Sequence, residues 1–350
     1  MRSTMRFAVI VSPKKAEIHE HDISSLKSNE ILIKNKTCNL CTTDYQQWMG
    51  LRKHQPVPVA FGHENSGTIV EIGKDVSNFE KGEMVVVNIY QPCLQCSNCR
   101  KGMNSIFCLN KAAGAKDKYG YYGFYGCGEY QIFNSKYVFK VNKNLPFEHA
   151  GFTEPLATVL YGTKKLRIET GDKILIIGAG TMGLLNAQVA RYYGGDVIIS
   201  EISEKKLNTA KKLGFEKLIN INNEDLAGKI ENFTKGKGLN VIIITVGNTR
   251  ANNQALDVAS KGCRLLIFAS GYPTPAWKLD SNLVHYKLLE IIGTFGCSTA
   301  DYQLSTELLN DKKIDVSPLI EERYLLKNVQ EAFVKAASPD TYRVVVCIQD

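Results

Sequence analysis

Hydrophobic and polar positions follow two different patterns along this chain of 350 residues. Up to about residue 150, short apolar runs rich in β-branched residues are separated by glycines and by small clusters of Asn, Asp and Ser. We expect these runs to be strands, at Phe7–Val11, Ile31–Asn35, Thr68–Ile72, Met84–Val87 and Tyr137–Val141. The first part of the chain is therefore predicted to be β-rich or irregular rather than helical.

The rhythm changes near Gly171, where strand-like and helix-like segments begin to alternate. The predicted strands are Lys173–Ile177, Val197–Ser200, Lys217–Ile219, Val241–Val246 and Arg264–Ala269. Helices are expected between them, among others at Met182–Tyr193 and Glu204–Leu213. Such alternation predicts a parallel sheet covered by helices on both faces. After Thr294 we expect two helices and a last strand, near Tyr302–Asn310, Leu326–Ala337 and Arg343–Ile348.

Composition narrows the class of protein only a little. The chain has 44% hydrophobic and 22% charged residues, which is typical of globular proteins. Its net charge of +8 is spread over many helices rather than gathered in one stretch, so we expect no nucleic-acid partner. The start shows no signal-peptide pattern, and apolar runs such as Val241–Val246 are too short to span a bilayer. We therefore expect a cytoplasmic protein that does not insert into membranes.

Four of the ten cysteines follow one another at short intervals, at positions 93, 96, 99 and 108. Cys93, Cys96, Cys99 and Cys108 have the spacing of a closed, four-thiolate structural zinc site. Two disulfides or an iron–sulfur cluster are the alternatives, although no proline follows Cys108 as it commonly does in ferredoxin-like runs. In a reducing compartment this pattern favours zinc.

A glycine motif follows the first strand of the alternating region. Gly178, Gly180 and Gly183 have the G-x-G-x-x-G spacing that lets a strand turn into a helix and leaves backbone N–H groups for a pyrophosphate. The next strand ends in Glu201, 18 residues after Gly183, where a carboxylate can bind ribose hydroxyls and repel the 2′-phosphate of NADP. The motif predicts NAD; the alternative is an ordinary tight turn followed by a surface glutamate.

Three further fragments could form an open metal site. They are Cys41-Thr-Thr-Asp44, Gly62-His63-Glu64 and Glu154-Pro155-Leu156. Each has an ordinary explanation alone: a strand end, a core histidine, and a helix start with proline in its first turn. The order of the three fragments, followed by a dinucleotide-binding pattern, favours an open metal site over these separate explanations.

With these motifs the chain resembles the zinc-containing medium-chain dehydrogenase/reductase family, in its alcohol, polyol and threonine dehydrogenase branch. The resemblance implies an α/β protein with a GroES-like β-rich catalytic domain, residues 1–154 and 295–350, and a Rossmann domain of doubly wound parallel sheet, residues 155–294. It implies that Cys41, His63, Glu64 and Glu154 surround a catalytic zinc and that Thr43 first takes the substrate proton. The expected NAD contacts are Gly178, Gly180, Thr181, Met182, Gly183, Glu201, Val246 and Phe295.

The chain departs from the family pattern at three places. Thr42 replaces a glycine, and Gln46 replaces the histidine that commonly ends the proton relay. Water beside Glu64 or a ribose hydroxyl could take that place. The gap before Cys108 is one residue longer than the commonest form. Cys38, which forms a C-x-x-C pair with Cys41, is interpreted as a strand residue.

The expected reaction is hydride transfer between NAD and a secondary alcohol of a small polyol, cyclitol or sugar (phosphate). A threonine- or butanediol-type dehydrogenase is the alternative. No arginine follows Gly293-Thr-Phe295-Gly296, which disfavours sorbitol itself. Arg52, Lys53 and His54 could attract an acid or a phosphate, but solvated surface is the preferred interpretation. A homodimer or homotetramer is expected.

Two functions without catalysis are further alternatives. A zinc-ribbon nucleic-acid binder would need basic and aromatic residues around Cys93–Cys108, and few are present. A catalytically silent relative would have lost a zinc ligand, and none is missing from the motifs.

Overall fold

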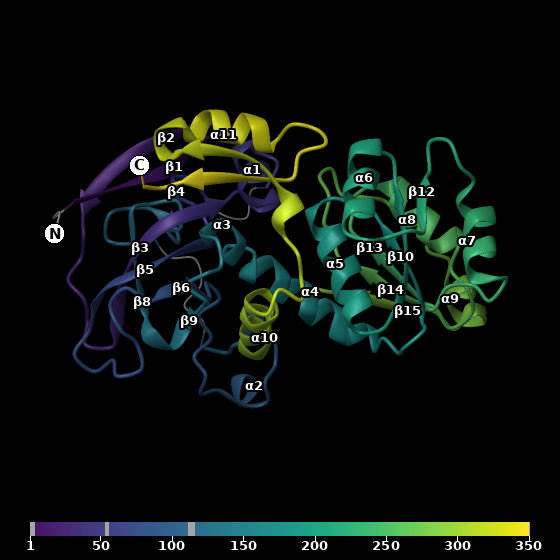
Figure 1. Cartoon of the computed structure of the whole chain (residues 1–350), viewed down its shortest axis with the longest axis horizontal. Helices are drawn as coiled ribbons and strands as arrows, with labels where there is room; N and C mark the ends of the chain where they lie inside the picture. Colours follow the sequence, from purple (N-terminus) through teal and green to yellow (C-terminus); the bar gives the residue numbers. More distant parts are fainter. Residues whose placement is uncertain (1–3, 53–55, 111–115, 350) are drawn as a thin grey trace. The chain divides into compact units, whose positions relative to one another are not determined.

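The computed structural model describes residues 4–52, 56–110 and 116–349, and it divides into two compact units. The first unit comprises residues 1–157 and 297–350, and the second comprises residues 158–296 (Figure 1). The first unit is thus built from two separate stretches of chain. Helix α4, Thr153–Leu166, carries the chain from one unit into the other.

The second unit is a six-stranded parallel sheet. Its strand order is β12-β11-β10-β13-β14-β15, which is the order 3-2-1-4-5-6 of the doubly wound dinucleotide fold. The strands are Leu218–Asn220, Asp196–Glu201, Lys173–Ile177, Val241–Ile244, Arg264–Ile267 and Glu290–Gly293, in that order. The central strands β10 and β13 are apolar and buried along almost their full length, because helices cover both faces of a parallel sheet.

Five helices lie between these strands in the chain. They are α5 (Thr181–Tyr192), α6 (Glu204–Lys212), α7 (Leu226–Thr234), α8 (Thr249–Asp257) and α9 (Ser281–Lys287). The side chain of Ser203 accepts the backbone N–H of Lys206, so Ser203 is the N-cap of α6. The order in which successive strands are added to the sheet reverses between β10 and β13, and the glycine motif lies at the carboxyl end of β10. In this fold ligands bind at that switch point.

The first unit contains two sheets. The larger has the order β16-β17-β3-β5-β6-β9, with β8 also paired to β3. These strands are Ile320–Leu325, Arg343–Cys347, Glu30–Asn39, Glu64–Ile72, Met84–Val87, Val138–Lys140 and Tyr130–Asn134. The smaller sheet has the order β2-β1-β4-β7, formed by Lys15–Asp22, Thr4–Ser12, Val59–Ala60 and Tyr122–Gly123.

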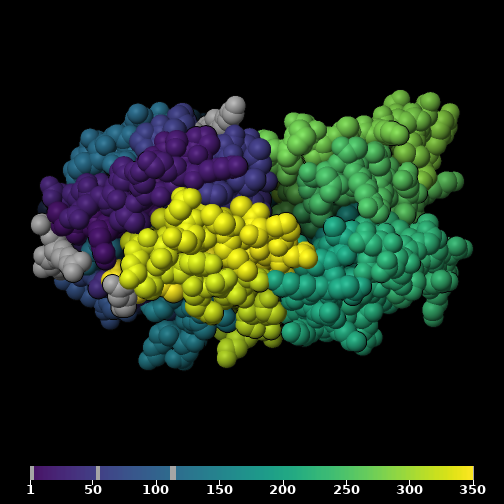
Figure 2. Space-filling model, turned by 90° about the horizontal axis from the view of Figure 1, so that it is seen from above, coloured from purple at the N-terminus to yellow at the C-terminus, as the bar shows by residue number. Residues whose placement is uncertain are grey.

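The first unit also contains helices. They are α1 (Thr42–Trp48), α2 (Ser97–Arg100), α3 (Phe147–Ala150), α10 (Thr299–Asn310) and α11 (Val329–Ala336). Phe333 of α11 stacks on Trp48 and packs against Phe61, with ring centroids 5.5 Å and 4.8 Å away. Figure 2 shows the late segment, in yellow, lying against the N-terminal strands, in purple. The two stretches of chain therefore share one core.

The structure differs from the sequence expectations mainly in the first unit. Helices α1, α2 and α3 interrupt a region expected to be free of helix, and β2, β8 and β16 were not foreseen. Tyr137, expected to start a strand, instead ends a 3-10 turn at Ser135–Tyr137. Among the described residues, no helix has the length and apolar character needed to cross a bilayer.

Candidate functional site

Cys41 lies at the point where β3 ends and α1 begins. It is the N-cap residue of α1, and its backbone N–H donates to the Asp44 carboxylate at 2.9 Å. The other oxygen of Asp44 lies 3.4 Å from Nδ1 of His63. Because Asp44 is buried and contacts both residues, it holds Cys41 and His63 in a fixed relation.

His63 and Glu64 enter the site at the start of β5. The preceding Gly62 has φ of +99°, and a Cβ there would come within 2.4 Å of the backbone nitrogen of Cys127. Only glycine fits this turn, which explains the glycine before His63. Donor atoms of Cys41, His63 and Glu64 lie within 4.8 Å of one another, so the structure brings these three predicted residues together.

Glu64 has a partner that the sequence did not reveal. Arg343 of β17 donates from Nε and Nη2 to the two carboxylate oxygens, at 2.8 Å and 2.7 Å, and both side chains are buried. Nη2 also lies 3.8 Å from Sγ of Cys41. Burial alone would lower the pKa of Arg343, but the charges of Glu64 and Cys41 raise it. No motif pointed to Arg343, because 279 residues separate it from Glu64.

Glu154 lies in the first turn of α4, directly before Pro155, and its side chain is buried. It is not within the 4.8 Å group, but its carboxylate interacts with the charges of His63, Glu64 and Arg343. The phenol of Tyr90, a second residue that the sequence did not reveal, donates to Oε1 at 3.0 Å. Burial raises the pKa of Glu154, and the neighbouring Glu64 adds to the shift.

The donor set fits a cation. Burial alone would lower the pKa of the His63 imidazole, yet the charges of Asp44 and Cys41 raise it well above its usual value. A place where anionic groups stabilise positive charge this strongly also favours a divalent metal ion. A thiol, an imidazole and a carboxylate are ligand types that zinc accepts in its catalytic sites.

Thr43 is the second residue of α1 and is half-buried. Its hydroxyl accepts a hydrogen bond of 2.8 Å from Nη1 of Arg52. Arg52 was expected to be solvated surface, so this contact corrects that interpretation. Lys53 and His54, which follow it, lie outside the described residues.

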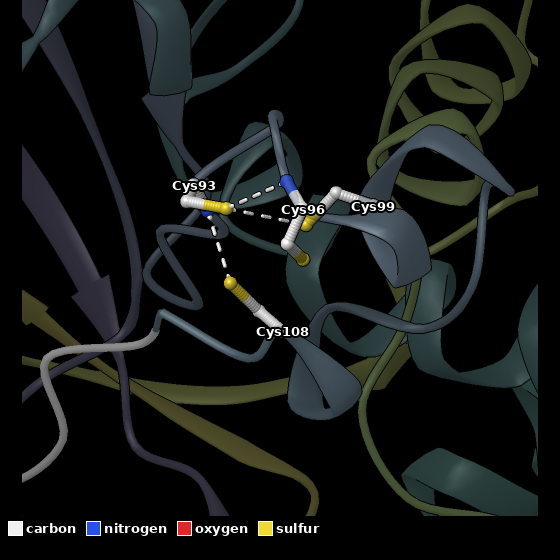
Figure 3. Close-up of side chains that lie close together, drawn as sticks. All are labelled: Cys93, Cys96, Cys99 and Cys108. Carbon is white, nitrogen blue, oxygen red and sulfur yellow. Dashed lines mark hydrogen bonds between the residues drawn. The ribbon is translucent and has the colours of Figure 1, made fainter.

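The four cysteines of the predicted structural site lie together around α2 and a short 3-10 turn, Ser105–Phe107 (Figure 3). Sγ of Cys93 lies 3.9 Å from Sγ of Cys99, close to the roughly 3.8 Å between sulfurs that ligate one tetrahedral zinc. Backbone N–H groups lower the pKa of Cys96 to about 6, which favours a thiolate. All ten cysteines fall within the described residues and are free, so the disulfide alternative is wrong. Cys38, also buried, is in β3 as expected.

The three glycines of the second unit have different surroundings. Gly178 has φ of +101°, and a Cβ at Gly183 would come within 2.0 Å of the carbonyl oxygen of Gly178. A Cβ at Gly180 would meet nothing within 4 Å. Gly178 therefore makes the turn, Gly183 allows close packing, and Gly180 leaves open space at the start of α5, where Thr181 and Met182 follow.

Glu201 ends β11 beside this loop and is buried. One carboxylate oxygen accepts the N–H of Ala179 at 2.7 Å, and the other accepts those of Ile202 and Ser203 at 2.7 Å and 3.1 Å. Glu201 therefore braces the glycine loop, a role that the sequence did not suggest. Val246 lies against Gly178, and Phe295 is largely exposed.

A doubly wound nucleotide fold, combined in one chain with a β-rich unit that has an open Cys–His–carboxylate group and a closed four-thiolate group, is typical of a zinc-binding dehydrogenase. Family models agree: an alcohol dehydrogenase GroES-like domain matches residues 27–143, and a zinc-binding dehydrogenase domain matches residues 181–311. The chain belongs to the zinc-dependent medium-chain dehydrogenase/reductase family and is an oxidoreductase of its alcohol dehydrogenase type.

Known relatives cover almost the whole chain. An L-threonine 3-dehydrogenase of Pyrococcus furiosus is 30% identical, with 95% of each chain covered. A sorbitol dehydrogenase of Halalkalibacterium halodurans is 28% identical, with 91% of each covered. A zinc-binding dehydrogenase structure from Sinorhizobium meliloti bound to NADP has a TM-score of 0.87 and 24% identity, covering 99% of this chain and all of the other. These relatives support the expected fold, and the names of the two enzymes give different substrates.

Proposed function

We propose that this protein transfers a hydride between NAD and a secondary alcohol of a small polyol, cyclitol or sugar, with one catalytic and one structural zinc ion in each chain. The observation that carries the proposal is the contrast between the two ligand groups. Cys41, His63 and a carboxylate leave a coordination position for substrate, whereas the four cysteines fill all positions. A threonine- or butanediol-type substrate is the second candidate, favoured by the threonine dehydrogenase relative.

Within the open site we assign the third zinc ligand to Glu154. Glu64 lies nearer to Cys41 and His63, but both of its oxygens already accept hydrogen bonds from Arg343. Glu154 stands at the edge of the group with the neutral donor Tyr90 on one oxygen. A carboxylate held by a guanidinium has less electron density to give to a metal, so Glu64 acts through Arg343 as a positioning residue.

A zinc ion held by Cys41, His63 and Glu154 would supply a Lewis acid that lowers the pKa of the bound alcohol. Asp44 would keep the His63 ring in its orientation, and the hydroxyl of Thr43 would receive the alcohol proton. Bound NAD would supply the hydride acceptor. Gln46 has no basic group, so the proton would pass from Thr43 to water or to a ribose hydroxyl.

We infer a preference for NAD from Glu201. Its carboxylate, fixed by three backbone N–H groups, lies at the end of β11, where a 2′-phosphate would have to approach it. Comparing kcat/KM for NAD and NADP tests this inference, and a preference for NADP would contradict it. The NADP in the Sinorhizobium structure makes the comparison necessary.

The decisive experiment combines metal analysis with a substrate panel. Purified protein should contain about two zinc ions per chain and should form NADH from at least one polyol, inositol, sugar phosphate, threonine or butanediol. Glu154→Gln should lower zinc affinity at the open site more than Glu64→Gln does, as measured by competition with a chelator. A fully active preparation without zinc would refute the mechanism, and a larger effect of Glu64→Gln would reverse the ligand assignment.

A further inference from the structure

A pocket of about 160 Å³ lies within the first unit, lined by residues of β1, β2, β3, β8 and the segment 117–125. None of the described residues that line it belongs to the open metal site or to the four-cysteine group. Apolar side chains such as Met5, Leu32 and Ile132 form part of its wall. An apolar cavity of about 150 Å³ is large enough to take up a benzene molecule, so this pocket has room for a small organic ligand.

Asp117 brings a negative charge to this pocket. Its Oδ1 accepts the backbone N–H groups of Tyr119 and Tyr121, at 2.9 Å and 3.0 Å, and its Oδ2 accepts the phenol of Tyr125. All three donors are neutral, so they orient the carboxylate without cancelling its charge. Among the residues that the structure describes, no basic side chain forms an ion pair with Asp117.

Two lysines flank this aspartate in the chain, but neither pairs with it. The ammonium nitrogen of Lys118 lies 4.7 Å from the centre of the Tyr119 ring, and that of Lys116 lies 5.4 Å from the centre of the Tyr122 ring. Both cations are thus held on tyrosine rings, at distances typical of cation–π contacts. The aromatic rings of this segment therefore hold cations, while the charge of Asp117 has no counter-ion in the described part of the chain.

Phe124 and Tyr130 also line the pocket, and their rings differ in surroundings from that of Tyr119. Tyr119 stacks on His21, with ring centroids 4.0 Å apart. Within the described ranges, no aromatic ring and no cation stacks on Phe124 or Tyr130. Because the face of an aromatic ring carries partial negative charge, the pocket combines two such rings with an uncompensated carboxylate.

We propose that this pocket binds the quaternary ammonium group of a small soluble compound of the trimethylammonium class. Asp117 already accepts three hydrogen bonds, so it attracts a ligand through its charge more than through free lone pairs. A quaternary ammonium has no N–H to donate, and its methyl groups carry positive charge to aromatic and apolar walls. A primary ammonium has three donors to satisfy and would lose more hydrogen bonds to water than the pocket returns.

A matched pair of ligands tests the proposal on the full-length protein. Choline and 3,3-dimethyl-1-butanol have nearly the same shape, but only choline is charged. Calorimetry should show that choline binds at least tenfold more tightly than the neutral alcohol. Asp117→Asn should lower the affinity for choline about tenfold and leave that for the alcohol unchanged within about twofold. Equal dissociation constants of the wild type for the two ligands would overturn the proposal.

Tyr130 provides a second pair of variants, which decides the matter if Asp117→Asn fails to fold in a thermal melt. Tyr130→Leu removes the ring and should weaken choline binding about fivefold, whereas Tyr130→Phe keeps the ring and should bind choline like the wild type. Equal losses in both variants would refute a contact between the ring and the cation. Asp75→Asn removes an exposed aspartate of the same unit and should leave choline binding unchanged.

The trimethylammonium group also occurs in the headgroup of phosphatidylcholine, so a further measurement separates the two sources. The protein should not sediment with phosphatidylcholine vesicles, and free choline should bind in their absence. Sedimentation with the vesicles without binding of free choline would overturn the proposal in favour of a lipid surface. These measurements need neither substrate nor turnover, so their outcome is independent of the proposed function.

Discussion

The two units of this protein build their sites from different materials. In the first unit the site consists of side chains that meet across long stretches of sequence, such as Glu64 with Arg343 and Glu154 with Tyr90. In the second unit the site consists mainly of backbone: a glycine turn, a helix N-terminus and a carboxylate that braces them. The first unit should therefore lose function through side-chain deletions, and the second should lose it through added atoms.

Removing a side chain at the open site should have the largest effect. Cys41→Ala takes away a ligand of the proposed catalytic zinc, so turnover should fall by about a thousandfold or more, roughly 4 kcal/mol of barrier. Cys41 does not belong to the closed four-cysteine group that would stabilise the fold. The variant should therefore keep its melting temperature and its NADH fluorescence. A variant that merely melts earlier, with turnover per folded molecule unchanged, would show that this site is structural.

Adding one methyl group to the glycine loop should give the next largest effect. In Gly183→Ala the new Cβ would meet the carbonyl oxygen of Gly178, a backbone atom that cannot yield, so about 3 kcal/mol of stability should be lost. Chemical denaturation measures this loss. Gly180→Ala is the matched control, since its Cβ meets nothing within 4 Å. It should melt like the wild type but bind NADH at least tenfold more weakly.

Those two alanine variants also test whether the second unit builds its site from backbone, with separate roles for Gly180 and Gly183. If Gly180→Ala binds NADH normally, the space beside Gly180 is not the pyrophosphate position. If Gly183→Ala keeps full stability, the loop does not depend on close backbone packing.

The four-cysteine group should respond to a deletion in its own way. Cys96→Ala opens a closed thiolate site, so the protein should lose one zinc ion and about 2 kcal/mol of stability. Melting temperature and elemental analysis should change first, while turnover of the molecules that remain folded should stay within a few fold. If Cys96→Ala abolishes turnover with an unchanged melt, the roles of the two metal groups are exchanged.

Glu201→Ala should have a smaller effect that falls on cofactor choice. The preference for NAD over NADP should narrow by about tenfold, because the charge that repels a 2′-phosphate is removed. The melting temperature should drop slightly as well, since three backbone N–H groups lose their acceptor. An unchanged ratio of kcat/KM for the two cofactors would show that Glu201 only braces the loop.

An ion-pair deletion far from the chemistry should have the smallest effect. Partial burial alone would raise the pKa of Asp196, but hydrogen bonds from Lys173 and Lys217 lower it. A lowered pKa in the folded state means that the stabilisation is present at neutral pH and disappears as the pH falls below about 4. Asp196→Asn should thus cost about 1 kcal/mol at pH 7 and less at pH 3, with the rest of the cost lost as the pH falls through the lowered pKa, as measured by denaturant titration at both values. An equal cost at both pH values would rule out this ion-pair origin.

The second unit was also the more predictable one, for a physical reason. A parallel sheet between two helix layers requires apolar strands and amphipathic helices in alternation, so Lys173–Ile177 and the glycine motif were evident in the sequence. The first unit depends on antiparallel pairs between distant segments, which leave a weaker periodic signal. Strands β2, β8 and β16 carry many polar or exposed positions and were missed.

The same distinction holds for individual site residues. Cys41 and His63 lie in short motifs whose spacing is informative, and the structure places their donor atoms together. Arg343, Tyr90 and Arg52 belong to no motif, because their roles arise only when the fold brings them to Glu64, Glu154 and Thr43. The residues next to Arg343, Tyr90 and Arg52 in the sequence do not indicate these contacts.

The position of β17 sets an order of events during synthesis. This strand pairs with β3, where Val345 opposes Asn39, so the larger sheet of the first unit needs a strand that leaves the ribosome some 300 residues after its partner. The second unit is one continuous stretch of chain and can fold before the C-terminal part of the first unit has been synthesised. Glu64 receives its arginine at the same late moment. The group of Cys41, His63 and Glu64 therefore gains its arginine partner only after the whole second unit has been synthesised.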